Sequence, residues 1–138
     1  MIQIATTEDR QTCYALRHEV FVVEQGYTAE GEVDALDSES LHLLARDNGT
    51  AVATARIHLD QGVGKIGRVC VLKSRRGIGL GADLIKAAIV LASNSKAHRV
   101  ILGAQAHAVG FYAALGFVAY GDPYDDEGEP HQMMEMVL

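Results

Sequence analysis

The sequence of 138 residues predicts an α+β (mixed α/β) fold, in which helices cover the faces of one central, mostly antiparallel mixed sheet. Two observations carry this prediction. In the first half, two strand-like segments flank Asn48-Gly49, a dipeptide typical of a tight hairpin between antiparallel strands. In the second half, a strand, an apolar helical run and another strand follow one another, as in a β-α-β unit whose strands lie parallel.

The expected strands are short and rich in apolar and β-branched residues. A second turn is expected at residues 61–64. In chain order the expected strands are residues 2–5, 41–46, 51–59, 65–72, 99–105, 117–121 and 132–138. We expect the final strand to have a free edge, which would allow two copies to pair as a homodimer.

Three helices are expected from apolar residues at helical spacing. The first spans residues 7–22, with Thr6 and Asp9 as an approximate capping box. The second follows a glycine-rich segment and ends near Ser93, and the third spans residues 108–115.

Two acidic connections lack apolar periodicity, residues 24–40 and residues 122–131. We expect residues 22–40 and 122–131 to build the pocket for an acceptor substrate, although neither segment contains a motif that identifies one. Their carboxylates either attract a cation or are solvated loop residues.

Composition limits the class of protein and its partners. A chain of this length, with 49% hydrophobic residues, fits a single domain with one core over residues 1–138. A net charge of -6 without a basic stripe argues against nucleic acid. The longest apolar run, residues 87–92, is too short to cross a membrane, and no signal peptide is visible. We therefore expect a cytoplasmic protein that binds neither nucleic acid nor membrane.

The two cysteines, Cys13 and Cys70, lie in apolar patterns and lack metal-ligand spacing. We expect both to be reduced core thiols in the cytoplasm, and we expect no metal site.

Three glycines at alternate positions, Gly77, Gly79 and Gly81, stand where the second helix begins. The first turn of a helix has unpaired N–H groups and a positive dipole end, and glycines let an anion approach them closely. The basic residues Lys73, Arg75 and Arg76 precede this loop. The segment therefore predicts a phosphate-binding loop, although glycines that serve only the turn geometry are the simpler alternative.

The identity of the phosphate ligand follows partly by exclusion. A nucleotide-binding P-loop needs GK[ST], but Ala82 and Asp83 follow Gly81. A dinucleotide fingerprint is formally present, yet it does not follow the first strand, and no acid lies about 20 residues on. An NAD(P)-binding protein is therefore a weaker alternative than a coenzyme A-binding one.

The sequence resembles the GNAT superfamily of N-acetyltransferases. Arg76-Gly77-Ile78-Gly79-Leu80-Gly81 is similar to the family's pyrophosphate motif, and FYAALGF at residues 111–117 is similar to its F-Y-x-x-x-G-F block. Segments along nearly the whole chain also resemble the small bacterial ElaA-like subgroup: residues 16–27, 42–45, 66–71, 104–112 and 128–134. Glu129 departs from the apolar residue usual in the subgroup. The resemblance implies a GNAT-like fold with a V-shaped splay between two parallel strands.

The resemblance also implies a binding site for acetyl-CoA. The strand before the glycine loop would offer its free edge to the pantetheine arm through Val69 and Val71, with the Val71 N–H near the thioester oxygen. Cys70 would point to the opposite face and serve as core rather than as an acetyl carrier. The implied coenzyme-binding residues are Val69, Cys70, Val71, Arg76, Gly77, Ile78, Gly79, Leu80, Gly81, Ala82 and Tyr112.

Tyr112, in the second block, is the candidate general acid that protonates the leaving thiolate, because a phenol and a thiol have comparable pKa values. Packing on the coenzyme without a proton role is its alternative. The base that accepts the proton of the amine is less well defined. Glu24, His42 and His131 are the candidates, with His42 in an expected strand, and His107 lies just before the third helix.

The expected function is an acetyl-CoA-dependent N-acetyltransferase that acts on a primary amine of a small molecule or an exposed lysine. The amine would attack directly, in a ternary complex. The alternative is an inactive coenzyme A-binding sensor or interaction module that kept the fold and lost the chemistry.

Overall fold

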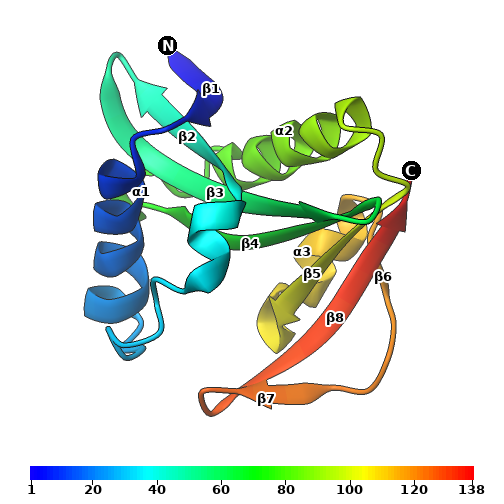
Figure 1. Cartoon of the computed structure of the whole chain (residues 1–138). Helices are drawn as coiled ribbons and strands as arrows, with labels where there is room; N and C mark the ends of the chain where they lie inside the picture. Colours follow the sequence, from blue (N-terminus) through cyan, green and yellow to red (C-terminus); the bar gives the residue numbers. More distant parts are fainter.

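The computed structural model describes residues 1–138 and contains one eight-stranded mixed sheet (Figure 1). The strands lie in the order β1-β2-β3-β4-β5-β8-β6, with β7 also paired to β8. Every neighbouring pair is antiparallel except β4 and β5. The strands are β1 (Ile2–Thr7), β2 (Leu41–Asp47), β3 (Thr50–Asp60), β4 (Val63–Val71), β5 (Arg99–Gln105), β6 (Val118–Ala119), β7 (Tyr124–Asp126) and β8 (Glu129–Val137). The predicted fold class is confirmed.

The two parallel strands pair over only part of their length. Residues 63–66 of β4 lie beside residues 99–102 of β5, and no pairing continues beyond them. Both strands extend further, so they diverge as the open V that Figure 1 shows between β4 and β5. The predicted splay is therefore present, and it leaves the second half of β4 with one unpaired edge.

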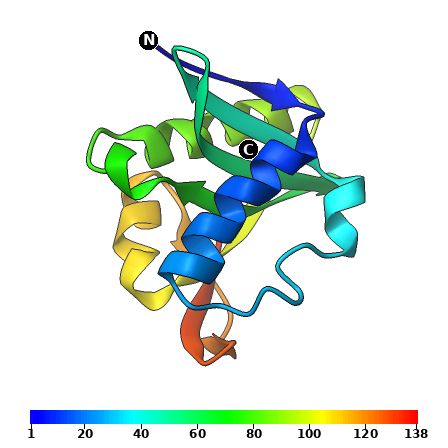
Figure 2. The same ribbon diagram turned by 90° about the vertical axis from the view of Figure 1, so that its left-hand side faces the viewer.

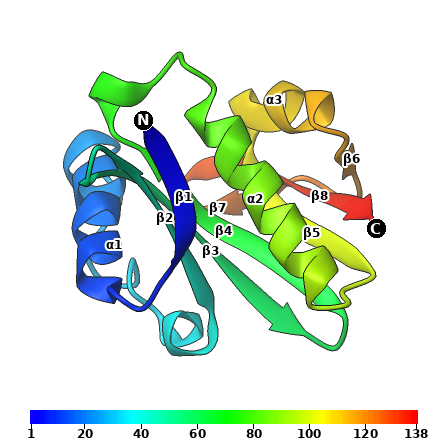
Figure 3. The same ribbon diagram turned by 90° about the horizontal axis from the view of Figure 1, so that it is seen from above.

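Helices lie on both sides of the sheet (Figure 3). The helix α1 (Arg10–Arg17) packs on one face through a small cluster around Cys13, Leu16 and Cys70. The helices α2 (Leu80–Asn94) and α3 (Val109–Ala114) pack on the other face, which carries the main core. Adjacent residues in β2, Leu43 and Leu44, belong to the two different clusters because side chains alternate along a strand.

The helix α2 forms where its apolar residues recur at helical spacing. Its buried residues are Leu80, Leu84, Ile85, Ala88 and Ala92. They make one continuous stripe against β3 and β4, which fixes the direction of the helix and therefore the position of its N-terminus at the splay.

The first helix differs from the predicted span 7–22. It begins at Arg10, and Asp9 alone caps it, with its carboxylate accepting from the Thr12 N–H at 3.2 Å. After Arg17 the chain continues as a π-helix, His18–Glu24, in which the Gln25 N–H donates to the Val20 carbonyl five residues earlier. The wider turn changes the residue period, so spacing at 3.6 residues could not predict which side chains face the sheet.

The turns between hairpin strands share one geometry. A non-glycine residue with φ near +50° precedes a glycine with φ between +78° and +89° at Asn48-Gly49, Gln61-Gly62 and Glu127-Gly128. The second turn is shorter than predicted, so β4 begins at Val63. The third lies inside residues 122–131, which were predicted to be loop but contain β7 and the start of β8.

The final strand has no free edge. β8 pairs with β5 on one side, and with β6 and β7 on the other. The predicted route to a homodimer through this strand is therefore wrong. No helix of the structure is long and apolar enough to cross a membrane.

Short 3-10 helices complete the chain: η2 (Ala35–Glu39), η3 (Lys73–Arg75) and η4 (Ala106–Ala108). The connection from Glu24 to η2 runs past the end of α1, on the side of the molecule where the β7–β8 hairpin protrudes (Figure 2).

Candidate active site

The open edge of β4 begins at a β-bulge. The register against β3 shifts between Thr54 and Arg56, and Arg68 on β4 has a left-handed φ of 52°. After the bulge, the Leu72 N–H donates to the Val52 carbonyl of β3 at 3.0 Å. Because backbone groups alternate between the two sides of a strand, those of Val69 and Val71 point away from β3, toward the splay.

The glycine loop lies at the end of this edge. Gly77 and Gly79 have φ of 84° and 82°, a conformation that other residues rarely adopt. A Cβ atom placed on either glycine would meet nothing within 4 Å. Gly79 is also the N-cap residue of α2, so the loop leaves the first helical N–H groups uncovered. The glycines therefore serve the turn and also leave open space for an anion.

One cavity, of about 480 Å³, lies between the open edge and the loop; we call it the glycine-loop cavity. Most of the predicted coenzyme-binding residues line it together: Val69, Cys70, Val71, Arg76, Gly77, Gly79, Leu80, Gly81 and Ala82. Of the other two, Ile78 is exposed outside the cavity, and Tyr112 lines a second one.

Arg76 bridges this cavity to the π-helix. Its Nε donates to the Val71 carbonyl at 3.0 Å, and its terminal nitrogens donate to both carboxylate oxygens of Glu24 at 2.5 and 2.6 Å. This hydrogen bonding lowers the pKa of Glu24 below its usual range. A carboxylate held in this way is a poor proton acceptor, which weighs against the predicted role of Glu24 as the base.

A second cavity, of about 500 Å³, fills the splay; we call it the splay cavity. Its walls come from the 24–40 connection, from β4 and β5, and from the β7–β8 hairpin. Val69 and Gln25 line both cavities, so the two spaces adjoin at these residues. Tyr112 and His131 both line the splay cavity.

Tyr112 stands between two aromatic rings, with centroids 5.0 Å from Phe111 and 6.0 Å from Phe117. Its hydroxyl has no hydrogen-bond partner in the protein, although the ring is partly buried. Burial raises the pKa of Tyr112 above its usual value. The phenol is therefore protonated at neutral pH and has a free O–H to donate.

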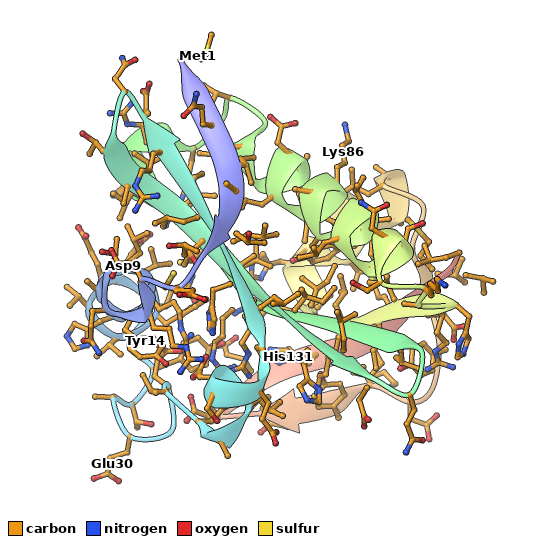
Figure 4. All side chains as sticks on the ribbon, turned by 45° about the horizontal axis from the view of Figure 1, so that its top comes forward. Met1, Asp9, Tyr14, Glu30, Lys86 and His131 are labelled. Carbon is orange, nitrogen blue, oxygen red and sulfur yellow. The ribbon has the colours of Figure 1, made fainter.

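His131 lies in β8, which begins three residues earlier than the expected last strand, and it is buried. Its Nδ1 contacts the Glu129 carbonyl at 2.8 Å. A carbonyl can only accept, so Nδ1 carries the hydrogen and Nε2 keeps a lone pair. Figure 4 shows His131 in the middle of the molecule, while Glu30 points away from the far side of the 24–40 connection. His131 is thus an available base inside the splay cavity.

The other two histidines considered in the sequence analysis do not line the splay cavity. His42 donates from Nε2 to the Asp37 carbonyl at 2.9 Å and lines neither cavity. His107 lines the glycine-loop cavity.

Cys70 lies in the small core cluster, and burial raises its pKa to about 12. At neutral pH this thiol stays protonated, which makes it a weak nucleophile. Its position agrees with a core residue at the back of the glycine-loop cavity.

The acids of the 24–40 connection are mostly neither solvated nor free for a ligand. Glu32, Asp34 and Asp37 form a network with three arginines that lie far apart in the sequence. Its ion pairs are Arg17–Glu32 (2.9 Å), Arg17–Asp37 (2.7 Å), Arg56–Asp34 (2.6 Å), Arg56–Asp37 (3.0 Å), Arg68–Glu32 (2.8 Å) and Arg68–Asp34 (3.2 Å). Three positive and three negative charges balance, so the network fixes the connection without adding net charge.

The rest of the splay cavity is closed by contacts between distant segments. Gln105 donates to the Tyr27 hydroxyl at 2.9 Å, and the Thr28 hydroxyl donates to the Glu127 carboxylate at 3.1 Å. The Tyr124 side chain lies across Gly103 of β5, in the space that a Cβ atom at residue 103 would need. The position of Tyr124 in the wall of this cavity therefore depends on a glycine in β5, on the far side of β8 from β7.

Sequence reasoning missed several lining residues. Phe21 faces the splay cavity from the π-helix, whose period the sequence pattern does not reveal, and Gln25, within the expected acceptor segment, also lines the glycine-loop cavity. Phe111 was visible as part of the second family block, but only its neighbour was assigned a role.

The comparisons with known proteins agree with this geometry. The acetyltransferase (GNAT) domain matches residues 4–138 of the chain. The N-acetyltransferase YjcF of Bacillus subtilis is 39% identical over 135 residues, which is 96% of each chain. An acyl-CoA N-acyltransferase from Pseudomonas aeruginosa superposes with a TM-score of 0.88 at 32% identity, covering 98% of this chain and 99% of that one. Escherichia coli ElaA superposes with a TM-score of 0.87 at 30% identity, again covering 98% and 99%.

A splayed mixed sheet with a glycine loop at the end of its open edge defines an acyltransferase fold, and the chain belongs to the GNAT family of acetyltransferases. Its activity class is N-acetyltransferase. Within the family, the predicted resemblance to the ElaA-like subgroup is confirmed.

Proposed function

We propose that this N-acetyltransferase moves the acetyl group of acetyl-CoA to a primary amine, on a small molecule or an exposed lysine, by direct attack in a ternary complex. The observation that carries the proposal is the pair of cavities on β4, which adjoin at Val69 and Gln25. One cavity has the open glycine loop that a diphosphate requires, and the other has an acid and a base. Residues 1–138 are proposed to work as one domain.

The glycine-loop cavity fits coenzyme A. The open space at Gly77 and Gly79 and the N–H groups of the first turn of α2 suit its diphosphate. The outward backbone groups of Val69 and Val71 suit an amide-containing arm, and the Val71 N–H would stabilise charge on the carbonyl oxygen. When bound, acetyl-CoA supplies an activated thioester. Arg76 would add positive charge, with Glu24 holding its side chain in place.

Proton transfer is assigned to two residues of the splay cavity. His131 Nε2 would take the proton that the amine loses as the C–N bond forms. The Tyr112 hydroxyl would give its proton to the sulfur as the C–S bond breaks, and would regain one from solvent while His131 releases its proton to solvent. Both residues lie in the cavity where the acceptor would bind, which supports attack without an enzyme-bound acetyl group. The high pKa of the Cys70 thiol supports the same route.

The proposal is tested by two measurements. Acetyl-CoA should raise the melting temperature clearly more than NAD or ATP does, because a ligand that binds only the folded state stabilises it. A panel of small amines and lysine-containing peptides should then contain an acceptor that drives release of free thiol from acetyl-CoA. Equal stabilisation by NAD would contradict the coenzyme assignment. Binding of acetyl-CoA with no thiol release for any amine would favour the sensor alternative.

A further inference from the structure

Arg68 lines the splay cavity and lies on β4 next to the point where the two cavities adjoin. It is the left-handed residue of the β4 bulge, and its backbone immediately precedes Val69, which lines both cavities. A residue other than glycine is rarely found with φ of 52°, so other contacts must hold it there. Bulges of this kind redirect a strand next to a functional site.

The contacts that hold Arg68 all reach the 24–40 connection. Its Nε donates to the Glu32 carbonyl at 3.1 Å and forms an ion pair with the Glu32 carboxylate at 2.8 Å. One terminal nitrogen donates to the Gly31 carbonyl at 3.3 Å and to the Asp34 carboxylate at 3.2 Å. One side chain therefore binds backbone carbonyls and carboxylates of residues 31–34 in the wall of the splay cavity.

The partners of Arg68 are themselves fixed from the other side. Arg17, which is buried, pairs with Glu32, and Arg56 pairs with Asp34 through two hydrogen bonds. Because both carboxylates are held by a second arginine, they cannot simply follow Arg68 if it moves. The bulge and residues 28–36 are thus tied to one shared framework.

We propose that Arg68 is a positioning residue that couples the acceptor-side wall, residues 28–36, to the open edge of β4 on which the donor binds. The inference rests on the proposed function, because it uses the donor and acceptor assignments of the two cavities. Arg68 does not touch the reacting atoms in this scheme. It sets the angle at which β4 leaves β5, and it holds the wall against the same point.

The coupling has a measurable consequence. A ligand that orders the edge of β4 should also order residues 28–36, although none of these residues lines the glycine-loop cavity. Coupling free energies between sites are reciprocal, so an acceptor should in turn tighten the binding of acetyl-CoA.

The test is backbone hydrogen exchange with and without acetyl-CoA. In the wild type, acetyl-CoA should slow exchange at residues 80–83 of α2 and also, by about fivefold or more, at residues 28–36. The variant Arg68→Gly keeps a residue that accepts the left-handed backbone but removes the guanidinium. It should retain protection at residues 80–83 and lose it at residues 28–36. Methylguanidinium added to this variant should restore the lost protection.

Arg10→Gln is the matched control, because exposed Arg10 also contacts the connection, at the Ser38 carbonyl, but lies on α1 rather than on β4. It should behave as the wild type. Protection of residues 28–36 that persists in folded Arg68→Gly, or is absent in the wild type, would overturn the coupling. If acetyl-CoA does not slow exchange at residues 80–83 in the wild type, the proposed donor site is overturned instead.

If Arg68→Gly does not fold, Arg68→Lys takes its place. Arg68→Lys keeps the positive charge but not the planar guanidinium that spans Glu32 and Asp34. It should therefore also retain protection at residues 80–83 and lose it at residues 28–36.

Discussion

The glycine loop and the 24–40 connection are both irregular, polar segments beside the splay, yet they are ordered by opposite means. The loop is ordered by backbone conformation, with left-handed glycines at residues 77 and 79 and little side-chain contact. The connection is ordered by side chains, through a buried network of three arginines and three carboxylates. The first arrangement leaves open space for a ligand, and the second makes a rigid wall. Under the proposed function, the donor would bind at the loop that is open and the acceptor beside the wall that is fixed by side chains.

The largest effect should come from removing the central arginine of the wall. Arg17→Met leaves Glu32 and Asp37 buried without their main partner, and breaking a buried pair in this way costs about 3–5 kcal/mol of unfolding free energy. Urea denaturation measures this loss. Arg10→Met on the exposed side of the same helix is the control and should change stability by less than about 0.5 kcal/mol. A similar small change in Arg17→Met would mean that the network does not order the connection.

Acid should weaken the same network more gradually. Burial opposes the ionised form of Asp37 and Asp34, but hydrogen bonds from Arg17 and Arg56 outweigh it and lower both pKa values. The unfolded chain therefore binds more protons than the folded one below about pH 4, so stability should fall on acidification in this range. Denaturant titrations from pH 6 to pH 2 would measure the slope, and Asp37→Asn should flatten it. An equal slope in that variant would contradict the assignment.

In the splay cavity, Tyr112→Phe separates a role in proton transfer from a role in packing. The ring contacts with Phe111 and Phe117 survive, but the hydroxyl is lost. If Tyr112 is the general acid, turnover should fall on the order of 10²-fold while the affinity for acetyl-CoA stays nearly unchanged. The loss should shrink with a donor whose thiol is more acidic. Wild-type turnover, under conditions where acyl transfer is rate-limiting, would reduce Tyr112 to a packing residue.

On the donor side, Gly79→Val should weaken binding of acetyl-CoA at least tenfold, or about 1.4 kcal/mol. The side chain would enter the open space at the loop. It would also strain the backbone, so Gly49→Val is the matched control: Gly49 has φ of 89° and an equally open position, but it lies in a distant hairpin turn. Calorimetric titration of both variants distinguishes the two causes. Equal affinities in the two variants would show that the loop glycines serve the turn alone.

The smallest effect is expected at Glu24. Glu24→Gln removes a charge from an exposed pair with Arg76, and such pairs contribute at most about 1 kcal/mol, so turnover should stay within about fivefold of the wild type. His131→Gln, by comparison, should lower turnover on the order of 10²-fold. Steady-state kinetics at saturating acetyl-CoA would compare the two. A large loss in Glu24→Gln alone would return the role of base to that carboxylate.

The two regions also differ in how well the sequence predicted them. The glycine loop was predictable because its conformation depends on residue types that are close together in the chain, Arg76 to Gly81. The wall formed by the 24–40 connection was not predictable, because each carboxylate pairs with an arginine that lies 15 to 36 positions away in the sequence. The sheet was predicted well where hairpin turns contain Asn-Gly, and poorly at Glu127-Gly128, where the acidic neighbours resembled a solvated loop. The π-helix was missed because it breaks the period on which helix prediction depends.

Gly103 of β5 determines where the Tyr124 side chain lies in the wall of the splay cavity. The hydroxyl of Tyr124 occupies the space above it, and a single methyl group at residue 103 would force that end of the side chain to shift. Since Tyr124 is partly exposed, it could swing outward without disturbing the core. If the splay cavity binds the acceptor, as proposed, a single substitution in β5 would change the shape offered to that acceptor and leave the glycine loop as it is.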